Sequence, residues 1–120
     1  ECLTYATAGM LTTREFIVMV AWYMLDRADL RDAFLAADEA GQTEMLEEIL
    51  RLEPVAALVY RKAAEDIEGP DGTTIRAGER FALDIRAANT DAAATGAAPL
   101  AFDAERGRRE KVPGGWLSFG

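Results

Sequence analysis

The sequence predicts a mainly α-helical fold with a small β region. The first 53 residues have the pattern of three helices, over residues 1–25, 28–37 and 43–53. After Pro54 the pattern changes to short apolar runs and alternating strands around a dense turn signal at residues 68–72. From residue 87 onward the chain is rich in Ala, Gly and Asp, with little periodicity. We therefore expect one partial domain over residues 1–120, built from helices (1–53), a small β region (54–86) and an irregular segment (87–120).

The first two helices are predicted from apolar patterning. The first becomes apolar all round over residues 16–25, about half of the ~20 residues that a membrane-spanning helix needs. This pattern is typical of a helix that crosses the centre of a protein. The second, shorter helix is amphipathic.

The third helix is predicted to begin at Thr43, a good N-cap, with Glu44 at the positive end of the helix dipole. Pro54 disfavours helix in the residue before it and ends the element. The apolar stripe of this helix consists of Met45, Leu46, Ile49, Leu50 and Leu52.

Strands are expected over residues 55–60, 73–75 and 80–85. The third is the clearest, because Phe81, Leu83 and Ile85 alternate with polar or small residues at the period of a half-buried strand. Residues 87–113 are expected to form a long loop, of the kind that is functional or packed against another part of the protein.

Composition excludes several function classes. The net charge of −8 argues against binding to nucleic acid or to an anionic membrane surface. The single cysteine, Cys2, excludes an internal disulfide framework, and the absence of histidine removes the commonest metal ligand and general base. The chain has no signal peptide, and both its ends look cut. We expect a piece of a larger, cytoplasmic protein without a membrane span.

A first group of residues that can support chemistry lies in the middle of the first helix. Thr12 can donate to the carbonyl of Ala8, and Gly9 leaves room for a bulky partner. Five residues share one face at helical spacing, and most of them are small or bear a hydroxyl: Thr4, Thr7, Ala8, Leu11 and Thr12. Such a face suits a flat ligand together with a small polar molecule. A close helix–helix contact made by small residues is the alternative.

A second group is Glu48 and Arg51, which face each other at i, i+3 spacing and can form a bidentate pair. The neighbouring acidic residues, Glu44 and Glu47, are interpreted together with Glu48 as a solvated helix face. The basic run over residues 106–111 is interpreted as a surface loop. Its alternative role is a docking patch for an acidic electron-transfer protein.

The order of motifs along the chain resembles the C-terminal part of the cytochrome P-450 family. The motifs begin with A-G-x-x-T-T in the long helix, E-E-x-x-R-L-x-P-V, and an apolar strand that ends at Arg61. They continue with E-D-I-E, T-I-x-A-G-E-R-F, A-A-N-x-D, F-D-x-x-R and finally W-L-S-F-G. The resemblance covers essentially the whole chain.

The resemblance implies a role for each group of residues. Ala8, Gly9 and Thr12 would lie on the distal face of a haem b (heme b, iron protoporphyrin IX), with Thr12 as the catalytic alcohol. Glu48 and Arg51 would belong to a structural network on the proximal side, and Arg61 would pair with a haem propionate. Phe119 would open the haem-cysteine loop. The substrate pocket would be lined within residues 55–59 and on the first helix, by Thr4, Thr7, Leu11, Val55, Ala56 and Leu58.

The resemblance further implies a monooxygenase that takes O2, two electrons from a ferredoxin-type or flavin-type donor, and a small apolar or amphipathic substrate. Four departures stand against the family pattern. Leu11 replaces the acid before the central threonine, and Ala101 stands where the network's third basic residue is expected. Trp116 replaces a frequent histidine, and the axial cysteine is expected only after Gly120. A non-catalytic scaffold or interaction fragment derived from the family is the alternative function.

Overall fold

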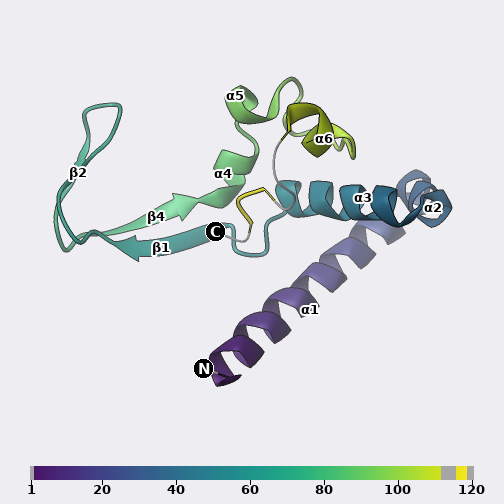
Figure 1. Cartoon of the computed structure of the whole chain (residues 1–120), viewed down its shortest axis with the longest axis horizontal. Coiled ribbons are helices and arrows are strands. Elements are labelled where there is room, and N and C mark those ends of the chain that lie inside the picture. Colours follow the sequence, from purple (N-terminus) through teal and green to yellow (C-terminus); the bar gives the residue numbers. More distant parts are fainter. Residues whose placement is uncertain (1, 112–115, 119–120) are drawn as a thin grey trace.

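The computed structural model describes residues 2–111 and 116–118, with the side chains of Cys2 and Thr7 left out. Three helices form the N-terminal half: α1 (Cys2–Asp26), α2 (Ala28–Ala36) and α3 (Glu39–Leu52). Figure 1 shows α1 running diagonally away from the end of α3 to which the short α2 connects it. These bounds confirm the predicted order of three helices.

The start of α3 differs from the prediction. Asp38 is the N-cap, and its carboxylate accepts a hydrogen bond from the backbone N–H of Gly41 at 2.9 Å. Thr43 lies inside the helix, where its hydroxyl donates to the Glu39 carbonyl oxygen at 2.9 Å. Aspartate is as good a cap as threonine, and with Asp38 in this position the helix starts one turn earlier.

The β region consists of two small antiparallel pairs. Strand β1 (Leu58–Lys62) pairs with β4 (Arg80–Asp84), and β2 (Ile67–Glu68) pairs with β3 (Thr74–Ile75). In the first pair Arg61 lies opposite Phe81 and Leu58 opposite Asp84. Figure 1 shows the hairpin that contains β2 extending away from the helices at the far end of β1 and β4.

The segment after β4 is more regular than the sequence indicates. Instead of one long loop it contains three short helices, α4 (Ile85–Asn89), α5 (Ala92–Thr95) and α6 (Arg106–Glu110). Asp84 and Asp91 cap the first two, each accepting from a backbone N–H. Gly96, which follows α5, has φ +76, a backbone conformation that favours glycine. Helices this short show no apolar period, so sequence patterning does not detect them.

The core gathers around α3. The buried apolar side chains are Leu30, Met45, Ile49, Leu50, Leu52, Ala63 and Ile85. The radius of gyration is 16.9 Å, whereas a compact domain of this length has about 14 Å. No helix of the described part of the chain is long and apolar enough to cross a membrane.

Much of α1 presents apolar side chains to solvent. Trp22 is 71% exposed and Met10 is 74% exposed, although both are large and apolar. Other exposed members on the same helix are Leu3, Tyr5, Leu11, Ile17, Val18 and Leu25. Apolar surface of this extent is typical of a face that another part of a protein covers.

We therefore expect the 120-residue chain, expressed alone, to self-associate. Burying the exposed side chains of α1 against another copy removes them from water, which favours association. Sedimentation across a concentration series, together with binding of a dye that reports apolar surface, measures this directly. A monomer at all concentrations with a sharp, cooperative thermal transition contradicts the expectation.

Candidate functional site

The centre of the molecule contains a buried ion pair on α3. Arg51 donates from Nε to Glu48 Oε2 at 2.7 Å and from Nη2 to Glu48 Oε1 at 2.8 Å. Arg51 is fully buried, and Glu48 is 2% exposed. This arrangement confirms the predicted bidentate pair. It also shows that the prediction of a solvated face is wrong for Glu48, while Glu44 is partly exposed and pairs with Arg108.

A second guanidinium completes the cluster. Arg106 in α6 is 1% exposed, and its Nε donates to Glu48 Oε1 at 3.3 Å. The expectation of an incomplete network was therefore wrong, because the third basic residue comes from position 106 rather than from the position of Ala101. The F-D-x-x-R motif marks Arg106 in the sequence, four residues after Phe102.

The two guanidinium groups also organise the irregular segment between α5 and α6. Segments without regular structure must find donors elsewhere for their buried carbonyl oxygens. Arg106 donates to the carbonyl oxygens of Thr95, Ala97, Ala98 and Ala101 at 2.7–3.1 Å. Arg51 donates to those of Asn89, Pro99 and Ala101. Within the described residues, no buried polar side-chain atom lacks a hydrogen-bond partner.

The rest of the basic run lies on the surface but is neutralised by acids of the same chain. Arg108 pairs with Glu44 and Glu105, and Arg109 pairs with Asp103 and Glu110. The hydrogen bond from Arg109 lowers the pKa of Asp103 below its usual value. The run is thus a short helix that contains one buried arginine, and the prediction of a simple surface loop was wrong.

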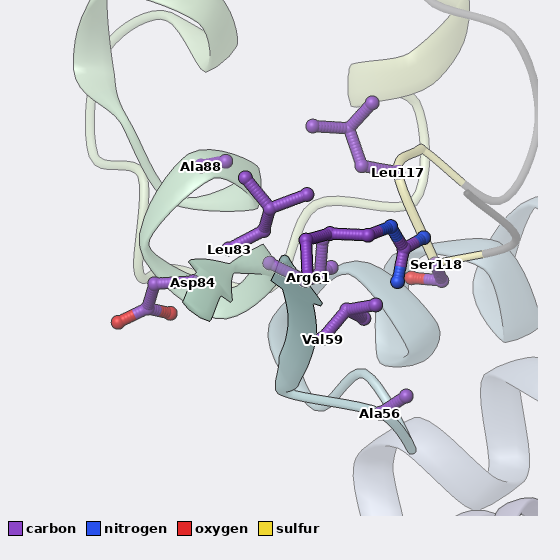
Figure 2. A pocket seen from close by; sticks show the side chains of 9 residues that line it. Ala56, Val59, Arg61, Leu83, Asp84, Ala88, Leu117 and Ser118 are labelled. Atoms are coloured by element: carbon purple, nitrogen blue, oxygen red, sulfur yellow. The ribbon is translucent and has the colours of Figure 1, made fainter. Parts of the chain in front are cut away.

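A pocket of about 490 Å³ opens beside the β1–β4 pair. Figure 2 shows the Arg61 guanidinium reaching toward Ser118, with Val59, Leu83 and Leu117 around the same hollow, while the Asp84 carboxylate points away. Arg61 donates to the carbonyl oxygen of Tyr60 at 3.0 Å, and the described residues provide no carboxylate partner for it. The pocket is therefore mostly apolar, with a cation whose charge no acid of the described residues neutralises.

A smaller pocket of about 230 Å³ adjoins α1 and shares Ala56 and Ser118 with the first. Its other lining residues are Thr12, Thr13, Phe16, Leu50 and Val55. The Thr12 hydroxyl donates to the Ala8 carbonyl oxygen at 2.6 Å, which confirms the predicted back-bond. Gly9 lies one turn before Thr12 and Thr13, and a Cβ on it would meet nothing within 4 Å. No close helix–helix contact is seen at Gly9 in the described part of the chain.

The structure brings some of the predicted pocket residues together and leaves others apart. Val55 and Ala56 lie with Thr12 around the smaller pocket. Neither pocket is lined by Thr4, Ala8, Gly9, Leu11 or Leu58. Leu58 is excluded because successive side chains of a strand alternate, and Val59 and Arg61 are the residues of β1 that face the larger pocket.

Two of the predicted site residues cannot be placed. Phe119 lies outside the described residues, and so does the side chain of Thr7. The α1 residues that line the smaller pocket, Thr12, Thr13 and Phe16, follow a face rotated from the predicted one. The two adjoining pockets can together hold a flat, mostly apolar ligand with an anionic group near Arg61 and a small polar molecule near Thr12.

Comparison with solved structures identifies this arrangement. P450BioI, solved in complex with an acyl carrier protein ligated to hexadec-9Z-enoic acid, is 34% identical to the chain with a TM-score of 0.79. The match covers 99% of this chain and 29% of P450BioI. CYP105D6 is 33% identical with a TM-score of 0.75, over 92% of this chain and 28% of its own.

Cytochrome P450SP alpha (CYP152B1), solved with (R)-ibuprophen, is 25% identical with a TM-score of 0.71, over 88% of this chain and 25% of its own. The chain thus spans less than a third of the solved proteins that it matches. No family model matches the sequence, and the search of curated proteins finds no match either.

Proposed function

Because the chain belongs to the cytochrome P-450 family of haem monooxygenases, we propose that it is the haem-facing C-terminal part of such an enzyme. The observation that carries the proposal is the pair of adjoining pockets, with the Thr12 hydroxyl on one side and the unneutralised Arg61 guanidinium on the other. The buried cluster of Glu48, Arg51 and Arg106 supports the same conclusion, since it stabilises the segment that leads to residues 116–118.

The residues of the two pockets fit a haem. A porphyrin requires apolar walls, and the larger pocket supplies Val59, Leu83 and Leu117. Its propionates require a cation, and the planar guanidinium of Arg61 suits a carboxylate. The surface of α1 at Gly9 is open, since a Cβ there would meet nothing within 4 Å. The axial thiolate is not supplied by these residues, and we propose that it follows Gly120.

Each side chain then has a defined task. Arg61 binds a propionate, and Val55 and Ala56 shape the substrate side of the smaller pocket. The Thr12 hydroxyl oxygen binds a proton donor or acceptor at the part of the helix where O2 and water would bind. When bound, the haem supplies the oxygen chemistry, for which a thiolate ligand favours O–O cleavage. Leu11 cannot exchange a proton, so delivery depends on Thr12, ordered water or the substrate.

The substrate is proposed to be small and apolar or amphipathic, and the electron donor to be a ferredoxin-type or flavin-type protein of the cytoplasm. An acyl chain is one such substrate, since P450BioI binds a carrier protein that holds one. The surface arginines Arg108 and Arg109 are neutralised by neighbouring acids, which speaks against α6 as the docking patch for the donor.

The alternative of a non-catalytic scaffold rested on two departures, an incomplete network and a missing relay acid. Arg106 completes the network and so removes the first departure, whereas the second, Leu11 in place of the acid, remains. A reduced-CO absorbance spectrum of the complete protein tests the proposal directly, because it reports thiolate ligation. A thiolate-type spectrum supports the monooxygenase. No haem, or haem without thiolate ligation, supports the scaffold.

Replacing Arg61 by glutamine should weaken haem retention in the complete protein. A hydrogen bond to a charged group is worth about 1.5–3 kcal/mol, so we expect haem to be lost to an acceptor protein on the order of 10- to 100-fold faster. Lys62→Gln is the matched control, because the next residue along β1 points to the opposite face. Equal rates of haem loss for both variants would remove Arg61 from the haem site.

A further inference from the structure

Asn89 joins the end of α4 to residues 117 and 118. The backbone N–H of Leu117 donates to Asn89 Oδ1 at 3.1 Å, and Asn89 Nδ2 donates to Ser118 Oγ at 3.3 Å. A backbone N–H can only donate, which fixes the orientation of the amide. Asn89 is 1% exposed, and its backbone carbonyl oxygen accepts from Arg51 at 2.9 Å. Asn89 thus binds residues 117–118 through its side-chain amide and the buried cluster through its backbone.

Ser118 makes a second connection, to α3. Its hydroxyl donates to the Leu50 carbonyl oxygen at 3.2 Å. In a continuing helix this carbonyl would accept from the residue four positions later, but that residue is Pro54, which has no N–H. The serine hydroxyl therefore satisfies a carbonyl that the proline leaves without its helical donor. It can do so while accepting from Asn89, because a hydroxyl both donates and accepts.

Trp116 makes a third connection. The Arg51 guanidinium carbon lies 5.5 Å from the centroid of the Trp116 ring, within the range of a cation–π contact. The N–H groups of Arg51 are engaged by Glu48 and by backbone carbonyls, so the ring covers a cation that is already held in place. Trp116 has φ +54, a backbone conformation that non-glycine residues rarely adopt.

From these contacts we infer that Asn89, Ser118 and Trp116 are positioning residues that fix residues 116–118 against α3 and α4. A fixed position of residues 116–118 determines the position from which the following part of the chain starts. The inference rests on the proposed function in one respect: the chain that follows is taken to carry the axial cysteine. Residues that orient a metal ligand without touching the metal change its binding roughly 10- to 100-fold when removed.

The test uses Asn89→Leu and Ser118→Ala in the complete protein, with two measurements. Hydrogen exchange at the Leu117 amide reports the contact itself, and we expect exchange to be roughly tenfold faster in Asn89→Leu. The reduced-CO spectrum reports the ligand, and we expect roughly tenfold less thiolate-ligated haem per protein in both variants. Ser118→Thr keeps the hydroxyl and should restore the spectrum.

Thr90→Ala is the matched control. The Thr90 hydroxyl donates to the Arg86 carbonyl oxygen at 2.8 Å, within the end of the same helix, so both measurements should remain as in the wild type. If Asn89→Leu does not fold, Ser118→Ala decides, since it removes one hydroxyl outside the helices. Unchanged spectra in Asn89→Leu and Ser118→Ala overturn the inference. If the wild type itself shows no thiolate ligation, the proposed function fails, and the Leu117 amide alone then decides whether residues 116–118 are fixed by Asn89.

Discussion

Glu48→Gln should destabilise the folded protein by about 3–5 kcal/mol, because it removes the carboxylate that neutralises two buried guanidinium groups. Arg51 and Arg106 both donate to Glu48, and each is at most 1% exposed. A neutral amide of the same shape cannot accept as strongly and would present its own N–H groups to one arginine. Unfolding by urea measures the change in the complete protein, and haem content should fall with it.

Glu47→Gln is the matched control, since Glu47 is the preceding residue of the same helix and lies outside the buried cluster. We expect a change below about 1 kcal/mol there, because Glu47 is only partly buried and forms no ion pair with another described residue. Combining Glu48→Gln with Arg106→Met should cost less than the sum of the two single changes, because the double variant removes one of the two uncompensated cations. Arg106→Met carries a cost of its own, since it also removes the donor to four backbone carbonyl oxygens. A cost below about 1 kcal/mol for Glu48→Gln alone would show that water reaches the cluster and that the three residues do not act as a buried unit.

Local patterns predicted the features that depend on neighbouring residues. The spacing of Glu48 and Arg51 is enough to predict their pair, and the position of Thr12 is enough to predict its bond to Ala8. The order of the first three helices and the existence of strands near residues 58–62, 74–75 and 80–84 also follow from local periodicity, whereas β2 and the short helices α4, α5 and α6 were not predicted. Each of these features is decided within one or two helical turns, where the sequence carries the information directly.

Features that depend on distant contacts were missed. Arg106 reads as part of a basic surface run, and only the fold brings it 58 positions back to Glu48. The cap at Asp38 was missed for a local reason, because Thr43 offers an equally good signal five residues later. Asn89 and Ser118 carry no periodic signal at all, and their contact spans 29 positions. The F-D-x-x-R and A-A-N-x-D motifs were the available signals for Arg106 and Asn89.

Thr12→Val should separate electron uptake from product formation. The hydroxyl has one proton, and in this structure it donates that proton to the Ala8 carbonyl oxygen at 2.6 Å. Its lone pairs are therefore available to a ligand in the smaller pocket. The hydroxyl can accept a hydrogen bond from that ligand, or it can give up its bond to Ala8 and donate to the ligand instead. Valine keeps the shape and removes both options.

We expect product formed per pair of electrons consumed to fall on the order of 10- to 100-fold in Thr12→Val, with peroxide released instead, since a positioned proton donor commonly contributes about this much or more. Thr12→Ser keeps the hydroxyl and should retain most of the product yield. Leu11→Asp adds a carboxylate next to Thr12 and should change the yield more than substrate affinity.

Thr43→Val is the control for the helix bond itself. Thr43 makes the same contact to the carbonyl four residues back, at 2.9 Å on α3, and it lines neither pocket. If loss of such a bond only loosens a helix, Thr12→Val and Thr43→Val should alter stability to a similar, small extent and leave the product yield unchanged. An unchanged yield in Thr12→Val would therefore make Thr12 a packing residue of α1 and would leave the smaller pocket without its proposed proton-carrying group. A fall in yield confined to Thr12→Val, with stability equal to that of the control, assigns the effect to the hydroxyl at the pocket wall.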